Sequence, residues 1–123
     1  MTAPVLQRAR ERALNVRAIA DIRIMESEIA IYIAYNFAPP VSLAVIGRAG
    51  MLDPWGNPYV YLALDAEKKG ARKDKFLVPL NSDYDLYSMG RDGESNKPLT
   101  AEVSRDDILR ALDGAFVGVA EDF

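Results

Sequence analysis

The chain has 123 residues, of which 50% are hydrophobic and 27% are charged, and its formal net charge is −3. These values predict one soluble globular domain, and the acidic balance argues against a nucleic-acid partner bound by neutralising phosphates. Cysteine and histidine are both absent, which argues against thiolate nucleophiles, zinc sites with sulfur ligands and histidine-based catalysis.

The first predicted element is one long helix over Pro4 to about Tyr35, a segment without glycine or internal proline, with Thr2 placed to cap it. Apolar residues recur along it at spacings of three and four, which indicates a stripe that packs on a core. This stripe consists of Leu14, Ala18, Ile22, Met25, Ile29 and Ile33. Ile24 and Ile31 lie off the stripe, as expected of a helix that is wrapped by a sheet or shared with neighbouring copies.

The first half of this helix is cationic and has little apolar surface, so we expect it to project into solvent. It carries Arg8, Arg10, Arg12 and Arg17, and Glu11 is the one acid before Asp21. Arginines near a helix N-terminus oppose the helix dipole, so one hypothesis is that the natural helix begins earlier. The arginines would then lie just outside a missing apolar segment, since no run here reaches the roughly 18 apolar residues that span a bilayer.

Pro39-Pro40 must end the helix, and we expect an exit at Asn36 and Phe37, with the Phe37 side chain turning back onto the core. The following stretch, 41–46, is short and apolar. Its pattern fits a strand and a buried helical turn equally well.

The densest turn and strand signals lie in the stretch LDPWGNPYVYL, which starts at Leu52. Asp53-Pro54 and Asn57-Pro58 are turn-forming dipeptides that exclude a helix. The aromatic and β-branched residues that follow predict a strand over Tyr59–Leu64. Trp55, the only tryptophan, is expected to anchor the core, and ligand stacking is the alternative interpretation.

Two further strands, Phe76–Leu80 and Tyr84–Met89, complete a predicted three-stranded antiparallel sheet. The mixed-charge stretch Asp65–Lys75 is expected to be a hairpin loop with solvated lysines. Beyond a polar loop, Ser104–Gly114 is typical of an N-capped helical turn. In the tail, Phe116 and Val117 are expected to tuck onto the sheet.

Acidic residues concentrate around the loop that follows the last predicted strand. They are Asp92, Glu94, Asp106 and Asp107, with Ser88 and the backbone carbonyls near Leu86 between them. Carboxylates and carbonyls without histidine or cysteine are the ligand set of a hard cation such as calcium. In the alternative interpretation Asp106 and Asp107 start a helix and Asp92-Gly93 is a turn. A hydrolase with paired carboxylates is a further alternative. It would need two carboxyl groups facing each other across a substrate cleft, and a sheet this small with one helix leaves little room for such a cleft.

A resemblance to a known family rests on three stretches: RAIADIRIMESEIAIYIAY from Arg17 to Tyr35, LDPWGNPYVY from Leu52, and DLYSMGRDG from Asp85 to Gly93. In this order they resemble the major pseudopilin of bacterial type II secretion systems, over nearly the whole chain. The resemblance implies an α+β, pilin-like fold in which a long N-terminal helix packs on a three-stranded antiparallel sheet, followed by a long C-terminal loop region. The single domain would have a helical stalk over 1–37, and the variable loop, the β-sheet and the C-terminal loop with its helical turn over 38–123.

The family implies a structural role without turnover chemistry: copies stack through their helices into a short periplasmic filament. The expected partners are further copies, other pseudopilins and an inner-membrane assembly platform. Members carry a leader and an apolar segment ahead of this region, which implies attachment to the bacterial inner membrane with this domain in the periplasm. The alternatives are a type IV pilin or minor pilin and, from another class, a small calcium-dependent binding module or a carboxylate hydrolase.

In similar proteins a calcium ion holds the C-terminal loop. On matching positions this nominates Ser88, Asp92 and the Leu86 carbonyl, with Asp106 and Asp107 from the second half of the loop. The family usually has a glycine-rich acidic stretch soon after the Asp-Gly, where this chain has an insertion over 95–100 and later a longer tail over 109–123.

Overall fold

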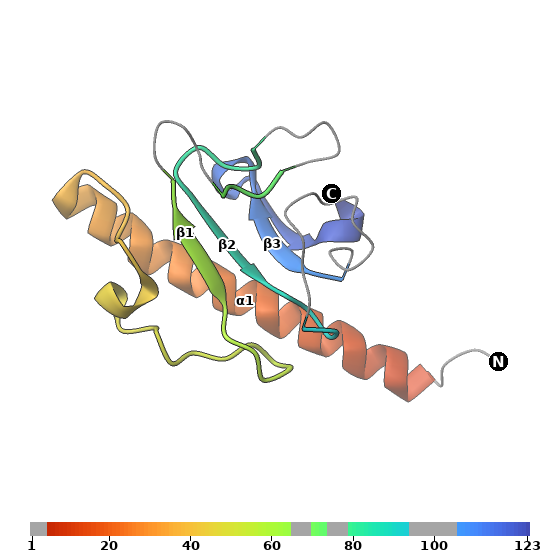
Figure 1. Cartoon of the computed structure of the whole chain (residues 1–123). Helices are drawn as coiled ribbons and strands as arrows, with labels where there is room; N and C mark the ends of the chain where they lie inside the picture. The colour runs from red at the N-terminus through yellow and green to blue at the C-terminus, as the bar shows by residue number, and fades with distance from the viewer. Residues whose placement is uncertain (1–4, 65–69, 74–78, 94–105) are drawn as a thin grey trace.

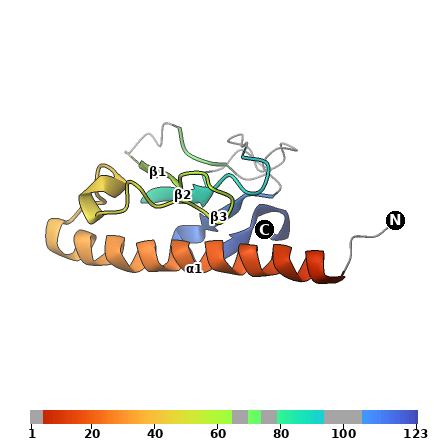
Figure 2. The ribbon, with the colours of Figure 1, turned by 90° about the horizontal axis from the view of Figure 1, so that it is seen from below.

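One long helix and one antiparallel sheet form two layers, as two perpendicular views show (Figure 1, Figure 2). We describe them from a computed structural model, which covers residues 5–64, 70–73, 79–93 and 106–123. The helix packs along one face of the sheet, so the chain has an α+β architecture.

The helix α1 spans Val5–Asn36, which confirms the predicted long helix, while Thr2 lies outside the described residues. Its 32 residues correspond to a rod about 48 Å long at about 1.5 Å per residue. The predicted stripe faces the sheet: four of its members have no exposed surface, and Leu14 and Ile33 are half-buried. The four are Ala18, Ile22, Met25 and Ile29.

The expectation for Phe37 is wrong, because its side chain is 91% exposed. Phe37 adopts a left-handed conformation with φ 62°, and its N–H donates a hydrogen bond of 2.7 Å to the Ile33 carbonyl. This conformation closes the helix and reverses the chain. The buried residue after the turn is instead Pro40, whose carbonyl accepts a hydrogen bond of 2.7 Å from the Tyr61 hydroxyl. The next segment is the 3₁₀ helix η1, Leu43–Ile46, so the helical interpretation of 41–46 is correct for its last four residues, of which only Leu43 is buried.

Within the described residues the sheet has four strands, so the predicted count of three is wrong. The strands are β1 (Val60–Ala63), β2 (Tyr84–Ser88), β3 (Ile108–Ala111) and β4 (Phe116–Val119). They lie in chain order and each pairs antiparallel with the next. Strands β1 and β2 confirm the predicted strands over 59–64 and 84–89. The third predicted strand, 76–80, lies mostly outside the described residues, and within them Pro79 forms an isolated bridge with Lys73.

The helical turn predicted over Ser104–Gly114 is wrong over Ile108–Ala111, which is strand β3, while Leu112–Gly114 is a 3₁₀ segment and residues 104–105 lie outside the described residues. All four of its residues are buried, since α1 covers one face of the sheet and residues such as Leu80 pack on the other. A short run buried on both faces lacks alternation and therefore resembles a buried helical turn in sequence. Phe116 and Val117 are part of the sheet, in β4, and do not merely cover it.

The main core lies between α1 and the sheet. Trp55 is half-buried and packs against this core, in agreement with its predicted anchoring role. The buried members of the core are Ala18, Ile22, Met25, Ile29, Leu43, Tyr59, Tyr84, Leu86 and Ile108. On the opposite face of the sheet, a smaller cluster contains Leu80, Leu109, Ala111 and Ala120.

Candidate functional site

The tryptophan-containing corner is fixed to the end of β2 by one buried carboxylate. Asp53 is 4% exposed, and its Oδ1 accepts hydrogen bonds from the backbone N–H groups of Trp55 (3.0 Å) and Asn57 (2.9 Å). Its Oδ2 accepts a hydrogen bond of 2.6 Å from the hydroxyl of Ser88. The Ser88 hydroxyl also accepts a hydrogen bond of 3.0 Å from the Gly90 N–H. Ser88, a predicted calcium ligand, therefore has hydrogen-bond partners on both sides within the protein.

The loop after β2 packs closely on the segment that enters β3. Gly90 has φ 71°, and a Cβ at this position would clash with the backbone of Asp106. The Asp92 N–H donates a hydrogen bond of 3.1 Å to the Oδ2 of Asp106. A glycine is thus required at residue 90, and it allows the two acidic segments to approach each other.

Three of the five predicted metal ligands come together here. Asp92, Asp106 and Asp107 each offer one carboxylate oxygen, and these three atoms lie within 4.8 Å of one another. The other two nominated residues, Leu86 and Ser88, lie in β2, where Leu86 pairs with Tyr61 and its side chain lies in the core.

The three aspartates offer chemistry that fits a hard cation. Oδ1 of Asp106 is buried and has no hydrogen-bond partner among the described residues. Burial raises the pKa of Asp106, and the neighbouring Asp92 carboxylate raises it further, while backbone hydrogen bonds oppose the shift. A divalent ion coordinated by carboxylate oxygens would offset the repulsion between these groups. Asp107 is fully buried, and its Oδ2 forms an ion pair of 2.8 Å with Nη1 of Arg72, which stabilises this carboxylate in its charged form.

Arg72 is a buried structural residue that the sequence interpretation missed. Its side chain is 2% exposed, and its guanidinium lies 4.3 Å from the centroid of the Tyr87 ring. Its backbone N–H donates a hydrogen bond of 2.6 Å to Asp85, and burial raises the pKa of Asp85 despite this bond. No signal in the sequence separates Arg72 from the solvated charges around it, because its partner Asp107 lies 35 residues away.

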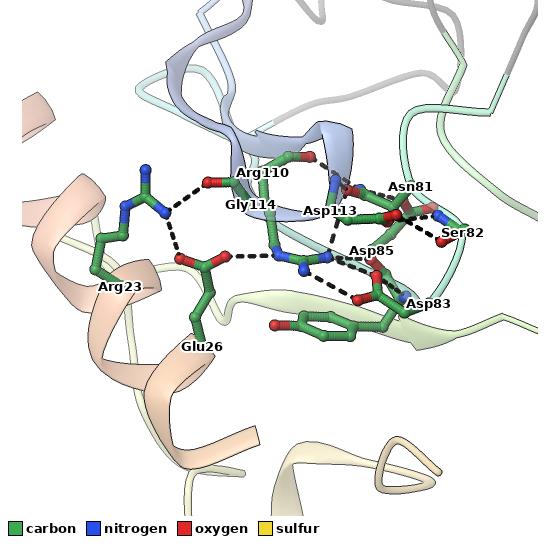
Figure 3. Close-up of polar contacts among 10 residues, drawn as sticks. Arg23, Glu26, Asn81, Ser82, Asp83, Asp85, Arg110, Asp113 and Gly114 are labelled. Carbon is green, nitrogen blue, oxygen red and sulfur yellow. Dashed lines mark hydrogen bonds and ion pairs between the residues drawn. The ribbon is translucent and has the colours of Figure 1, made fainter. Parts of the chain in front are cut away.

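A second buried arginine joins α1 to the sheet (Figure 3). Nε of Arg110 lies 2.7 Å from Oε2 of Glu26 in α1, and its two Nη atoms lie 2.7 and 3.1 Å from the two carboxylate oxygens of Asp83. Its guanidinium lies 3.9 Å from the centroid of the Tyr84 ring. Burial acts to lower the pKa of Arg110, but the ion pairs raise it above its ordinary value on balance. Glu26 also accepts a hydrogen bond of 2.8 Å from Arg23.

The turn after β3 supports this ion-pair network. It is the 3₁₀ segment η3, Leu112–Gly114, in which all three residues have positive φ. The Asp113 carboxylate accepts hydrogen bonds from the backbone N–H (2.7 Å) and the hydroxyl (2.6 Å) of Ser82. A Cβ on Gly114 would lie 2.6 Å from Oε2 of Glu26, so this glycine leaves the space that the carboxylate of Glu26 occupies.

The outward face of α1 carries a second row of uncharged residues, which we call the outer stripe. Its members are Leu6, Ala9, Ala13, Val16, Ala20, Ile24, Ser27, Ile31 and Ala34, and all of them are exposed. With about 100° of rotation per residue, they lie within a sector about 80° wide, roughly opposite the buried stripe. Val16 is 64% exposed and Ile31 is 61% exposed, so no part of the chain that the structure describes covers the apolar surface of this face.

Among the described residues, no helix combines the length and the apolar character needed to cross a membrane. A scan against protein-family models, a search of curated proteins and a search of solved structures give no match to this chain.

Proposed function

We propose that this chain is a structural subunit of a periplasmic pseudopilus of a type II secretion system and that it polymerises through α1. The observation that carries the proposal is the outer stripe, an exposed uncharged row on the helix face opposite the sheet. Isolated exposed apolar residues are common on soluble proteins, but a continuous row along one helix is typical of an interaction surface.

The spacing of the outer stripe supports packing against other helices. From Leu6 to Ala34 it advances 28 residues in eight steps, which is an average of 3.5 residues per step. This is the period of helices that pack side by side, and the alanines at residues 9, 13 and 20 allow close approach of a neighbouring backbone. The helix would thus bind its own sheet on one face and neighbouring helices on the other.

The pilin-like interpretation joins this surface to the resemblance of the three sequence stretches. A long helix on an antiparallel sheet is compatible with the pilin-like interpretation. The sheet has one strand more than the three that the resemblance implies, since β4 pairs with β3 at its edge. Under this proposal the partners are further copies, other pseudopilins and an inner-membrane assembly platform. An apolar segment ahead of Val5 would attach the subunit to the bacterial inner membrane, with this domain in the periplasm.

We further propose that the three aspartates bind calcium and thereby tie the loop after β2 to the start of β3. Asp92 and Asp106 come from opposite sides of the intervening segment 94–105, so one ion between them would restrain both of its ends. The role of the ion would be structural, as in the proteins that the sequence resembles.

The test is filament assembly in a bacterium that produces this chain from its own reading frame, with any upstream coding sequence, together with its secretion system. We expect Ile31→Lys to abolish sheared filaments seen by immunoelectron microscopy, because a charge would interrupt the outer stripe. Leu112→Lys is the matched control, since Leu112 is also 61% exposed but lies outside α1. Wild-type amounts of filament from the Ile31→Lys chain would contradict the proposed function.

A further inference from the structure

The four arginines in the first half of α1 have no ion-pair partner within the described part of the chain. Arg8, Arg10, Arg12 and Arg17 form no ion pair there, whereas the five other described arginines each form at least one. All four side chains are exposed. At about 100° of rotation per residue they lie on both flanks of the outer stripe, and together they would attract a negatively charged partner to this end of the helix.

An acidic pocket lies near the same end of the molecule, between α1, the tryptophan-containing corner and the C-terminal segment. It has a volume of about 170 Å³, and its lining includes Glu11, Trp55, Arg91, Asp106 and Glu121. Arg91 pairs with Glu11 at 2.5 Å, so one of the three carboxylates is neutralised within the chain. Glu121 forms no ion pair within the described residues, so the pocket keeps a net negative charge even when Asp106 contributes its carboxylate to the proposed calcium site.

The aromatic wall of this pocket suits a guanidinium group. Trp55 packs against the core on one side and lines the pocket on another. A planar guanidinium stacks on an indole and pairs with carboxylates at its edges, which an ammonium group does less well. The lining of the pocket thus combines the stacking surface and the negative charge that an arginine side chain requires.

We infer that this pocket receives an arginine from the exposed half of α1 in a second copy of the chain. The inference rests on the proposed function, because it names a contact between filament subunits. The choice of occupant follows from charge complementarity: the unpaired cations of one copy match the net negative charge of the pocket in the next copy. None of the arginines at residues 8, 10, 12 and 17 lines the pocket of its own chain.

Such a contact joins two different surfaces, the arginines of α1 and the acidic pocket, and each copy of the chain would carry both. Contacts of this type propagate into open chains unless the rotation between copies closes a ring. The arginine contact would therefore give direction to an assembly, while the outer stripe would supply its apolar packing.

The test uses two variants of the soluble chain in sedimentation velocity at millimolar protein concentration. One variant carries Arg8→Glu, Arg10→Glu and Arg12→Glu, and the other carries Glu121→Lys. We expect wild type to associate weakly at low salt and to dissociate as salt shortens the screening length from about 30 Å at 0.01 M to about 10 Å at 0.1 M. Each variant alone should lose this association, and an equimolar mixture should regain it, because the charges are then complementary again.

Two controls separate a specific contact from general charge effects. Asp122→Lys makes the same change of charge one residue from Glu121, at an exposed position outside the pocket lining, and it should leave the association intact. Replacing the three arginines by lysine keeps the charge but removes the planar group, and it should weaken the association. Thermal melting of every variant shows whether it is folded.

A monomeric wild type at low salt, equal losses for Asp122→Lys and Glu121→Lys, or a mixture that fails to reassociate would each overturn the inference. The proposed function fails independently, through filaments that persist in the Ile31→Lys chain. If filaments require Ile31 but are insensitive to both charge variants, the function stands and this contact does not.

Discussion

The carboxylate of Asp53 and the hydroxyl of Ser88 lie 2.6 Å apart, although 35 residues separate them in the chain. This hydrogen bond joins the tryptophan-containing corner to the last residue of β2, immediately before the loop that carries Asp92. The placement of the candidate cation site therefore depends on a buried carboxylate that is not itself among the grouped aspartates.

We expect Asp53→Ala to lower the free energy of unfolding by about 2 to 4 kcal/mol, because two backbone N–H groups and one hydroxyl lose their acceptor. Ser88→Ala removes one of these bonds and should cost about 1 kcal/mol. Urea denaturation followed by tryptophan fluorescence measures both values. Equal effects of the two substitutions would show that the backbone hydrogen bonds of Asp53 contribute nothing.

Arg110→Ala should cost about 3 kcal/mol of stability, because it leaves the carboxylates of Glu26 and Asp83 without their shared, nearly buried cation. Arg23→Ala is the matched control: Arg23 pairs with the same Glu26, but its side chain is 48% exposed, and its loss should cost less than about 1 kcal/mol. Chemical denaturation of the two variants under identical conditions tests the difference. A smaller loss for Arg110→Ala than for Arg23→Ala would contradict the role of Arg110 in joining α1 to the sheet.

Asp113 should contribute a pH-dependent part of stability. Burial acts to raise the pKa of Asp113, but hydrogen bonds from Ser82 outweigh it and lower the pKa overall. A carboxylate with a lowered pKa in the folded state stabilises the protein above the ordinary aspartate pKa of about 4, and this contribution is lost as pH falls through the lowered value. The stability difference between wild type and Asp113→Asn should thus be constant above about pH 5 and shrink below about pH 4.

Acid denaturation curves of wild type and Asp113→Asn measure this difference. Asp122→Asn serves as the control, since the Asp122 side chain accepts no hydrogen bond within the described residues. If the stability difference between wild type and Asp113→Asn instead grows toward low pH, the lowered pKa of Asp113 is contradicted.

Calcium should raise the melting temperature if the three aspartates bind it in the folded state. An ion that binds the native state alone stabilises it by about 2.7 kcal/mol when its concentration is 100 times Kd. We expect the melt to shift between millimolar calcium and excess chelator, and Asp92→Ala to abolish the shift. Asp122→Ala, which removes an acid outside the group, should retain it. An unchanged wild-type melt would eliminate the calcium site.

Several features follow from the sequence by itself because they depend on local chemistry. The absence of glycine and internal proline over residues 5–36 determines one unbroken helix, and its spacing of apolar residues identifies the buried stripe. The turn dipeptides before Tyr59 and the alternation after Tyr84 determine β1 and β2. The acids that the structure groups are also visible in the sequence as a cluster without histidine or cysteine.

Only the tertiary structure decides the features that depend on distant partners. Ile108–Ala111 is a strand because α1 and Leu80 cover its two faces, and its local pattern fits a helical turn as well. Arg72 is buried because Asp107 and Tyr87 reach it across the fold, whereas its sequence neighbours suggest a solvated charge. The exposure of Ile24 and Ile31 likewise follows from the sheet, which covers one face of α1 and leaves the opposite face open.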